Sequence, residues 1–297
     1  MDERTALRML ADVLPVAGDD AAVVDDLVVT TDMLHETTDF PTGTTRYTAG
    51  WRAVGASLSD VAAMGVPATA AVAAYAAPQF DEDELTAFVH GARDVAERVD
   101  ATYVGGDLDQ HEEFTTATTA IGRVGETVPV LRSGARPGEV VCVTGTLGRS
   151  AAGVRAFEHD DADRGNELFQ FVPRVQEGTR LAAHATAMMD SSDGLARSLH
   201  QLADASDCGF VVDADRIPAH DALATYADPA DVWDLTVAFG EDFELVCTLS
   251  PSALAEAQAA LDAFGTSLTV VGDVVECDAG ITVDGEPLPD RGYTHGQ

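Results

Sequence analysis

Apolar residues recur along the chain in two alternating patterns, short runs typical of strands and wider spacings typical of helices. Strand patterns are expected at residues 27–31, 68–76, 114–124, 139–143, 209–213, 243–249 and 268–275. Helical patterns are expected at residues 45–64, 82–99, 150–158, 175–184, 194–205 and 251–264. This alternation predicts a mixed α/β fold. The turn-rich run RSGARPGEVV divides it into an N-terminal domain over residues 1–135 and a C-terminal α/β domain over residues 136–297.

The two helices expected in the first half differ in what surrounds them. The helix at 82–99 has one apolar stripe and a charged outer face, as a surface helix does. The helix at 45–64 has apolar or small residues on both sides, and Asp60 is the only acid between Thr45 and Phe80. We therefore expect this helix in the interior or at a subunit interface. A lone carboxylate there must be paired or bind a metal ion, because an isolated buried charge is costly.

The charge balance is strongly acidic. The sequence holds 51 Asp and Glu against 17 Lys and Arg, all of them Arg, which gives a net charge of -34. Phosphate backbones and anionic membrane surfaces would be repelled, so neither nucleic acid nor a membrane is expected as a partner. Concentrated salt screens such self-repulsion, and the composition therefore predicts the cytoplasm of a halophile. An acidic surface reserved for a basic partner stays open as an alternative.

Cysteine usage and the apolar segments give no sign of export or membrane insertion. Cys142, Cys208, Cys247 and Cys277 lie far apart beside apolar residues, which predicts buried reduced thiols rather than a zinc site. The first residues lack the pattern of a secretory signal. Residues 61–80 carry no charge, but their prolines and small residues argue against a membrane span.

Short acidic motifs are expected at turns rather than on solvated helix faces. They are Gly18-Asp19-Asp20, Thr30-Thr31-Asp32, Ser59-Asp60, Gly105-Gly106-Asp107 and Asp190-Ser191-Ser192-Asp193-Gly194. Any one of them alone is an ordinary turn-forming sequence. Together they offer a set of oxygen ligands without His or Cys, which is the ligand type that Mg²⁺ prefers. The spacing of an EF-hand calcium loop is absent.

The missing lysine limits how phosphate could be bound. Both the Walker A loop and the strand lysine of protein kinases are excluded, so Mg²⁺ ions and arginines must neutralise the phosphate charge. Arg132 and Arg136, in the run LRSGARPG, are candidate phosphate contacts, with a solvated linker as the alternative. The glycines of residues 143–153 either turn backbone N–H groups toward an anion or allow close packing between a strand and a helix.

A family resemblance adds to these observations. The segments GDDAAVV, TTDML, SLSDVAAMGVP, GGD, LRSGARPG, VTGTLGRSAAG, MDSSDGL, GEDFEL and GYTH occur in this order along nearly the whole chain. Together they resemble the thiamine-monophosphate kinases. The wider group includes aminoimidazole ribonucleotide synthetase, selenophosphate synthetase and a hydrogenase-maturation carbamoyl dehydratase. The resemblance implies a two-domain aminoimidazole ribonucleotide synthetase-like fold, whose N-terminal domain forms a β-barrel across a homodimer.

The resemblance also implies roles for individual residues. The metal ligands would be Asp20, Thr30, Thr31, Asp32, Asp60, Asp107, Asp190 and Asp193. Residues near ATP would be Gly106, Asp107, Arg132 and Ser192. Glu241 matches a substrate-contacting position, and no residue is expected to act as a catalytic acid or base. Asp39 and Asp290 stand where relatives have histidine or an aromatic residue, and we expect them to contact the cationic thiamine ring.

The implied reaction is direct in-line transfer of the ATP γ-phosphoryl group to thiamine monophosphate, with several Mg²⁺ ions and no phosphoenzyme. Two alternatives stay open at this point. One is another ATP-using enzyme of the same group, although the carboxy-terminal cysteine of the carbamoyl dehydratase and the early reactive cysteine of selenophosphate synthetase are absent. The other is a nucleotide-binding protein without turnover.

The acidic composition predicts a protein that requires salt. Diluting KCl from molar to millimolar concentration should lower the melting temperature, because the Debye length grows from about 3 Å toward 30 Å as screening is lost. Circular dichroism melts at a series of KCl concentrations measure this. Equal melting temperatures across the series would contradict the halophilic interpretation.

Overall fold

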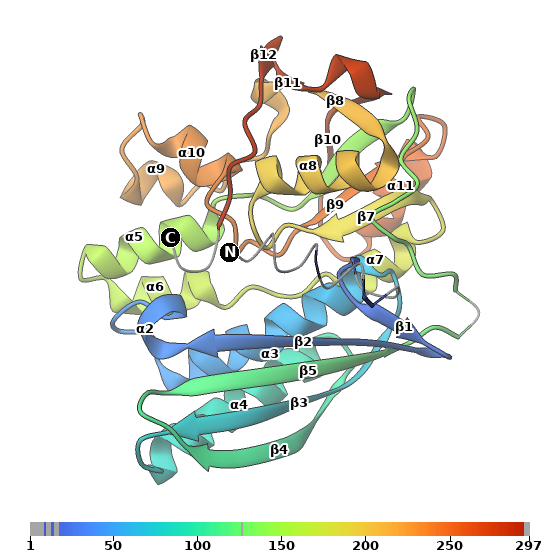
Figure 1. Ribbon diagram of the computed structural model, residues 1–297. Coiled ribbons are helices and arrows are strands. Elements are labelled where there is room, and N and C mark those ends of the chain that lie inside the picture. The colour runs from blue at the N-terminus through green and yellow to red at the C-terminus, as the bar shows by residue number, and fades with distance from the viewer. Residues whose placement is uncertain (1–8, 10–12, 15–17, 126, 294–297) are drawn as a thin grey trace.

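Two β-sheets organise the chain (Figure 1). The computed structural model describes residues 9, 13–14, 18–125 and 127–293. The first sheet has five strands in the order β1-β2-β5-β3-β4, and only the β3–β4 pair is parallel. Its strands are β1 (Ala22–Val24), β2 (Leu27–His35), β3 (Ala68–Ala77), β4 (Thr102–Gln110) and β5 (Thr115–Arg123).

Two long helices cover one face of this sheet, α3 (Arg46–Ala63) and α4 (Glu82–Arg98) (Figure 1). The short α2 (Glu36–Asp39) follows β2. Side chains alternate along β5, and buried Thr116 and Thr118 point to the helix side. Most of α3 is buried, because it packs against the first sheet on one side and against α7 and β7 of the second half on the other. The prediction that this helix lies in the interior is confirmed.

The second sheet has seven strands in the order β12-β11-β8-β10-β6-β9-β7. Its strands are β6 (Val140–Thr144), β7 (Ala185–Asp190), β8 (Cys208–Val212), β9 (Leu245–Leu249), β10 (Leu268–Glu276), β11 (Ile281–Val283) and β12 (Glu286–Pro287). Its helices are α5 (Arg149–Glu158), α6 (Ala162–Phe169), α7 (Val175–Leu181), α8 (Leu195–Ser206), α9 (Leu223–Tyr226), α10 (Val232–Val237) and α11 (Leu254–Asp262). Two short 3₁₀ turns are η1 (Ala214–Arg216) and η2 (Cys277–Ala279).

The expected mixed α/β fold is confirmed, and the elements expected from periodicity are present. Their ends differ: β2 runs on to His35, while α7 and α11 are shorter than expected. Several elements were missed, among them β4, β7 and α6. Strand β4 was missed because it has no run of apolar residues. It is a largely exposed edge strand, so polar residues and glycines are tolerated along it.

Three details of the sequence-based prediction need correction. Thr30-Thr31-Asp32 and Gly105-Gly106-Asp107 lie inside strands β2 and β4, and Ser59-Asp60 lies in the last turn of α3, so these motifs are not turns. Cys142, Cys208 and Cys247 are buried as expected, but Cys277 is exposed because it lies on the surface turn η2. Thr294 and His295 of the GYTH segment lie outside the described residues. None of the described helices has the length and apolarity needed to cross a membrane.

Helices α3 and α4 approach each other closely at two glycines. A Cβ atom at Gly91 would lie 1.9 Å from the carbonyl oxygen of Tyr47, and one at Gly50 would lie 2.1 Å from that of Phe88. No side chain fits between such backbones. The contact sets the distance between α3 and α4, and thereby the position of α3 over the sheet.

Replacing Gly91 with alanine should therefore destabilise the protein by about 2 kcal/mol or more. The direction of the change in stability is informative, because replacing glycine with alanine at an unhindered helical position stabilises the protein by about 1 kcal/mol. Urea unfolding at constant molar KCl measures the change. Thr86→Ala places the same residue at an exposed position of α4 and should be neutral or slightly stabilising. A Gly91→Ala protein as stable as the wild type would contradict the close approach.

Candidate metal and nucleotide site

Three carboxylates meet where the two sheets face each other. Asp20 precedes β1, Asp60 lies in the last turn of α3, and Asp190 ends β7. One oxygen from each lies within 4.8 Å of the others. The three come from segments far apart in the sequence, and both halves of the chain contribute. The group Asp20, Asp60 and Asp190 is called the carboxylate cluster below.

Neighbouring side chains hold the carboxylate cluster in place. Thr30 donates a hydrogen bond to Asp60 at 2.5 Å. Asp32 also lies near, since its charge acts on both Asp60 and Asp190, and it accepts a hydrogen bond from Ser57 at 2.7 Å. Thr30 and Asp32 reach this side together because side chains two residues apart share a face of a strand. Thr31 lies on the opposite face, where it donates to the carbonyl oxygen of Thr118.

Burial and mutual repulsion make it costly to ionise two carboxylates of the cluster, Asp60 and Asp190, which raises their pKa values. Burial raises the pKa of Asp60 well above its ordinary value, and the charges of Asp32, Asp190 and Asp20 raise it further. Burial also raises the pKa of Asp190 to about 8, and Asp20 adds to the effect. Neither Asp190 oxygen has a hydrogen-bond partner of ordinary geometry among the described residues. Buried, repelling oxygens without donors fit a divalent cation, which would neutralise them.

Arg132 pairs with a member of the carboxylate cluster. Its guanidinium binds both oxygens of Asp20, at 2.8 and 3.1 Å, and its backbone N–H donates to Asp19. The charges of Asp20, Asp190 and Asp19 raise the pKa of Arg132, against the effect of burial, so it remains charged. Arg136 lies apart from this contact, and its backbone N–H donates to Glu139.

Other expected site residues lie around the loop that follows Asp190. The carbonyl oxygen of Ser192 accepts from the N–H of Glu241, and that of Asp193 accepts from the N–H of Tyr293. The Tyr293 hydroxyl reaches Asp39 at 3.4 Å, and Asp39 also accepts from the N–H of His35. Asp290 forms an ion pair with Arg197 of α8 at 2.6 Å. The structure thus brings Ser192, Asp193, Glu241, Asp39 and Asp290 into one region.

Gly106 and Asp107 are not part of this assembly within one chain. They lie on β4, which is the edge strand opposite β1 and β2 in the first sheet, and both residues are exposed. A Cβ atom at Gly106 would lie 1.7 Å from the carbonyl oxygen of Ala73, so the backbones of β3 and β4 require glycine there.

Sequence reasoning missed Arg52, a nearly fully buried residue of α3 that is 2% exposed. It donates to the side chain of Glu241 at 2.7 Å, to the Glu241 carbonyl oxygen and to the Ser150 hydroxyl. Its guanidinium also lies 4.2 Å from the centre of the Phe169 ring. The sequence did contain an indication of this role, because Arg52 is one of very few charged residues in a helix that is otherwise apolar or small.

Arg52 anchors a backbone segment in a rare conformation. Glu241 and Phe243 have φ angles of 58° and 53°, in the left-handed region that non-glycine residues seldom adopt. Such conformations persist only where surrounding contacts enforce them, and they cluster at functional sites. The segment also braces the loop after Asp190, because Ser191 donates its N–H to the carbonyl oxygen of Glu244 at 2.7 Å.

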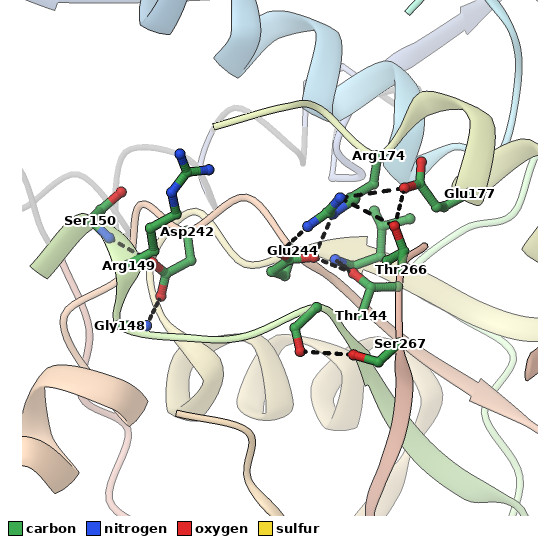
Figure 2. A network of polar contacts seen from close by, with 12 residues as sticks. Thr144, Gly148, Arg149, Ser150, Arg174, Glu177, Asp242, Glu244, Thr266 and Ser267 are labelled. Carbon is green, nitrogen blue, oxygen red and sulfur yellow. Dashed lines mark hydrogen bonds and ion pairs between the residues drawn. The ribbon is translucent and has the colours of Figure 1, made fainter. Parts of the chain in front are cut away.

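The glycine-bearing turn before α5 does face an anion, and that anion is a side chain of this protein. The carboxylate of Asp242 accepts from the N–H groups of Gly148 and Ser150, at 2.5 and 3.0 Å (Figure 2). Burial raises the pKa of Asp242 to about 7, although these two donors lower it. The backbone N–H groups at this helix start are therefore already used.

Comparisons with known proteins decide the family. Residues 18–124 match the family described as AIR synthase related protein, N-terminal domain, and residues 136–284 match its C-terminal domain counterpart. A thiamine-monophosphate kinase of Halobacterium salinarum is 60% identical over 99% of this chain and 100% of its own length. This chain belongs to the thiamine-monophosphate kinase family.

Further members of the family agree. A thiamine-monophosphate kinase of Methanospirillum hungatei is 39% identical over 99% of both chains. The solved structure described as AaThiL complexed with AMPPCP and TMP superposes with a TM-score of 0.88 at 26% identity, over 99% of this chain and 97% of that one. The family and enzyme class expected from the sequence motifs are confirmed, and the salt-loving relative agrees with the halophilic composition.

The raised pKa values predict how stability changes with pH and metal. Asp190 and Asp60 are protonated more readily in the folded protein, so their contribution to stability is present near pH 4 and is lost as the pH rises toward about 8. Metal-free Asp60→Asn should therefore be more stable than the wild type at pH 8, by about 1 kcal/mol or more.

Mg²⁺ should stabilise the wild type at pH 8 and have little effect on Asp60→Asn. Melting temperatures with and without Mg²⁺, in a chelator-treated protein, measure both effects. Asp26→Asn removes an exposed carboxylate that pairs with Arg123 and should respond to Mg²⁺ as the wild type does. Equal Mg²⁺ stabilisation of Asp60→Asn and wild type would contradict a metal at the carboxylate cluster.

Proposed function

We propose that this chain phosphorylates thiamine monophosphate with ATP, giving thiamine diphosphate and ADP by direct in-line transfer in the cytoplasm. The observation that carries the proposal is the carboxylate cluster, whose buried Asp190 oxygens accept no hydrogen bond of ordinary geometry from the described residues, in a chain 60% identical to a thiamine-monophosphate kinase. The relative described as complexed with AMPPCP and TMP supports the pair of substrates.

The residues proposed to hold Mg²⁺ are those of the carboxylate cluster together with Thr30, Asp32, Asp107 and Asp193. The side chain of Thr31, which was also expected there, lies on the opposite face of β2 and is left out of the proposal. When bound, Mg²⁺ would neutralise the phosphate oxygens of both substrates, which otherwise repel each other and the carboxylates. The acceptor is already an anionic phosphate, so the chain needs no catalytic base. Its own residues act by positioning: Arg132 fixes Asp20, Ser57 fixes Asp32, and Arg52 fixes the segment that braces Asp190.

The site is proposed to be completed by a second copy of the chain. Asp107 and Gly106, expected near metal and ATP, lie on an exposed edge strand away from the carboxylate cluster. Exposed apolar side chains accompany them, Val104 and Leu108 on β4 at 62% and 52% and Met33 on β2 at 55%. A homodimer that joins these strands would bury those side chains and bring Asp107 to the partner's site.

The substrate end is proposed to lie around the loop after Asp190. Glu241, Asp39 and Asp290 surround it. Glu241 and Asp290 are ion-paired with Arg52 and Arg197, so a cationic thiazolium ring would share these carboxylates with the arginines. Arg132, which binds Asp20, and Ser192, in the loop after Asp190, are proposed to contact ATP. Mg²⁺ and ATP are therefore the metal and co-substrate that the proposal requires.

The experiment that tests the proposal offers the purified protein ATP, Mg²⁺ and thiamine monophosphate at molar KCl. Thiamine diphosphate and ADP should form in equal amounts, followed by chromatography. Free thiamine and a phosphate ester with a neutral pyrimidine ring serve as competing acceptors. Turnover of none of the three, or preference for the neutral ring, would overturn the thiamine assignment.

Asp107→Asn should lower kcat by about 100-fold or more while leaving the melting temperature unchanged, because it removes a proposed metal-ligating charge from an exposed position. Asp109→Asn changes an exposed carboxylate two residues along the same strand and should retain activity. Steady-state kinetics at saturating Mg²⁺ compare the two. Near-native turnover of Asp107→Asn would remove this residue from the proposed site.

A further inference from the structure

A cavity of about 240 Å³ lies in the second half of the chain, and its lining includes no residue of the carboxylate cluster. It is lined by Thr146, Arg149, Arg164, Glu167, Leu168, Arg174, His220 and Glu244. Three of the 17 basic residues thus gather around one cavity in a protein with a net charge of -34. The cavity is several times larger than the space one water molecule needs.

Both acidic groups of this cavity are already paired. Arg174 binds both oxygens of Glu244, at 2.6 and 2.7 Å, and also contacts Glu177 (Figure 2). Arg164 pairs with Glu167 at 2.6 Å. The carboxylates therefore offer little to a further cation, and their charges are compensated.

Arg149 is the arginine of the cavity lining that is outside the ion pairs of the described residues. Among the described residues it forms no ion pair, and it donates only to the carbonyl oxygens of Glu167 and Gln170, at 3.0 Å each. Burial lowers its pKa, the charges of Arg174 and Arg52 lower it further, and the charges of Glu244 and Asp242 offset part of this effect. The nearby start of α5 cannot supply a ligand site by itself, because Asp242 occupies its N–H groups.

The remaining polar groups of the cavity also offer donors. His220 accepts a hydrogen bond from the N–H of Ala222 at Nδ1, so the proton of the neutral ring lies on Nε2. Burial and the charge of Arg149 lower the pKa of His220, which keeps the ring neutral. Thr146 adds a hydroxyl. The cavity thus combines a guanidinium outside the ion pairs of the described residues with neutral donors, and both of its carboxylates are ion-paired.

We propose that this cavity is a binding site for a small oxyanion, a phosphate group held by Arg149 with help from His220, Thr146 and the paired Arg164 and Arg174. A guanidinium fork binds phosphate oxygens with charge-assisted hydrogen bonds. None of the residues that line the cavity belongs to the carboxylate cluster, although the carbonyl oxygen of Glu244 accepts from the N–H of Ser191, next to Asp190.

The test measures binding of inorganic phosphate to the full chain by calorimetric titration, in chelator-treated protein at constant KCl concentration. Saturable binding of one phosphate per chain is expected for the wild type. Arg149→Gln should weaken the affinity by about 10-fold or more, the effect of losing a hydrogen bond to a charged group. Arg155→Gln removes the same charge from an exposed position of the same helix, where the side chain pairs with Glu158, and should bind as the wild type does.

Further titrations show which anions bind to the cavity and whether the carboxylate cluster contributes to their binding. Glycerol phosphate in place of inorganic phosphate tells whether an ester is accepted, and sulfate tests for any tetrahedral oxyanion. Asp60→Asn should leave phosphate binding unchanged, and Arg149→Lys, which keeps the charge, should bind with intermediate affinity if Arg149→Gln does not fold. Absence of saturable binding, equal loss in Arg155→Gln, or a change in Asp60→Asn would overturn the proposal. ATP and Mg²⁺ are absent, so the result does not depend on the kinase reaction.

Discussion

Repulsion between buried carboxylates is the constraint on which the site depends. One oxygen from each of Asp20, Asp60 and Asp190 lies within 4.8 Å of the others, so a negative charge on Asp20 or Asp190 makes it more costly to ionise Asp60. Two neighbouring side chains reduce this repulsion. Arg132 neutralises the charge of Asp20, and the hydroxyl of Thr30 donates a hydrogen bond to Asp60. The charge that remains, centred on Asp190, is what a divalent cation would neutralise.

Helix α3 connects this constraint to the rest of the fold. It carries Asp60 at one end and Arg52 two turns earlier, and its remaining surface is almost free of charge because both halves of the chain cover it. Its position is fixed by the glycine contact with α4. Arg52 then holds the left-handed segment around Glu241, which contacts the loop carrying Asp190. One helix therefore sets the geometry on both sides of the site.

The distribution of arginine also follows from electrostatics. With no lysine in the chain, the cations inside the protein are guanidinium groups, which bind carboxylates through two parallel hydrogen bonds. Arg132 with Asp20 and Arg174 with Glu244 both do so. Meanwhile the excess of acids lies outside, where salt screens it. The protein thus keeps an acidic surface, while Arg132 and Arg174 each neutralise one carboxylate inside it.

The sequence alone determined the features that depend on local pattern and residue chemistry. Helical periodicity located α3 and α4, the lone Asp60 in an uncharged stretch marked an interior carboxylate, and the motifs identified the family. The tertiary structure decided what depends on contacts between distant segments. It grouped Asp60 with Asp20 and Asp190 and left Asp107 on a far edge strand, because strand order, not sequence spacing, sets these distances. It also showed that Asp242 is the anion bound at the turn before α5 and that Arg52 holds Glu241. The hydrophobic pattern of a sequence predicts which residues are buried, but it does not predict which distant residue each of them contacts.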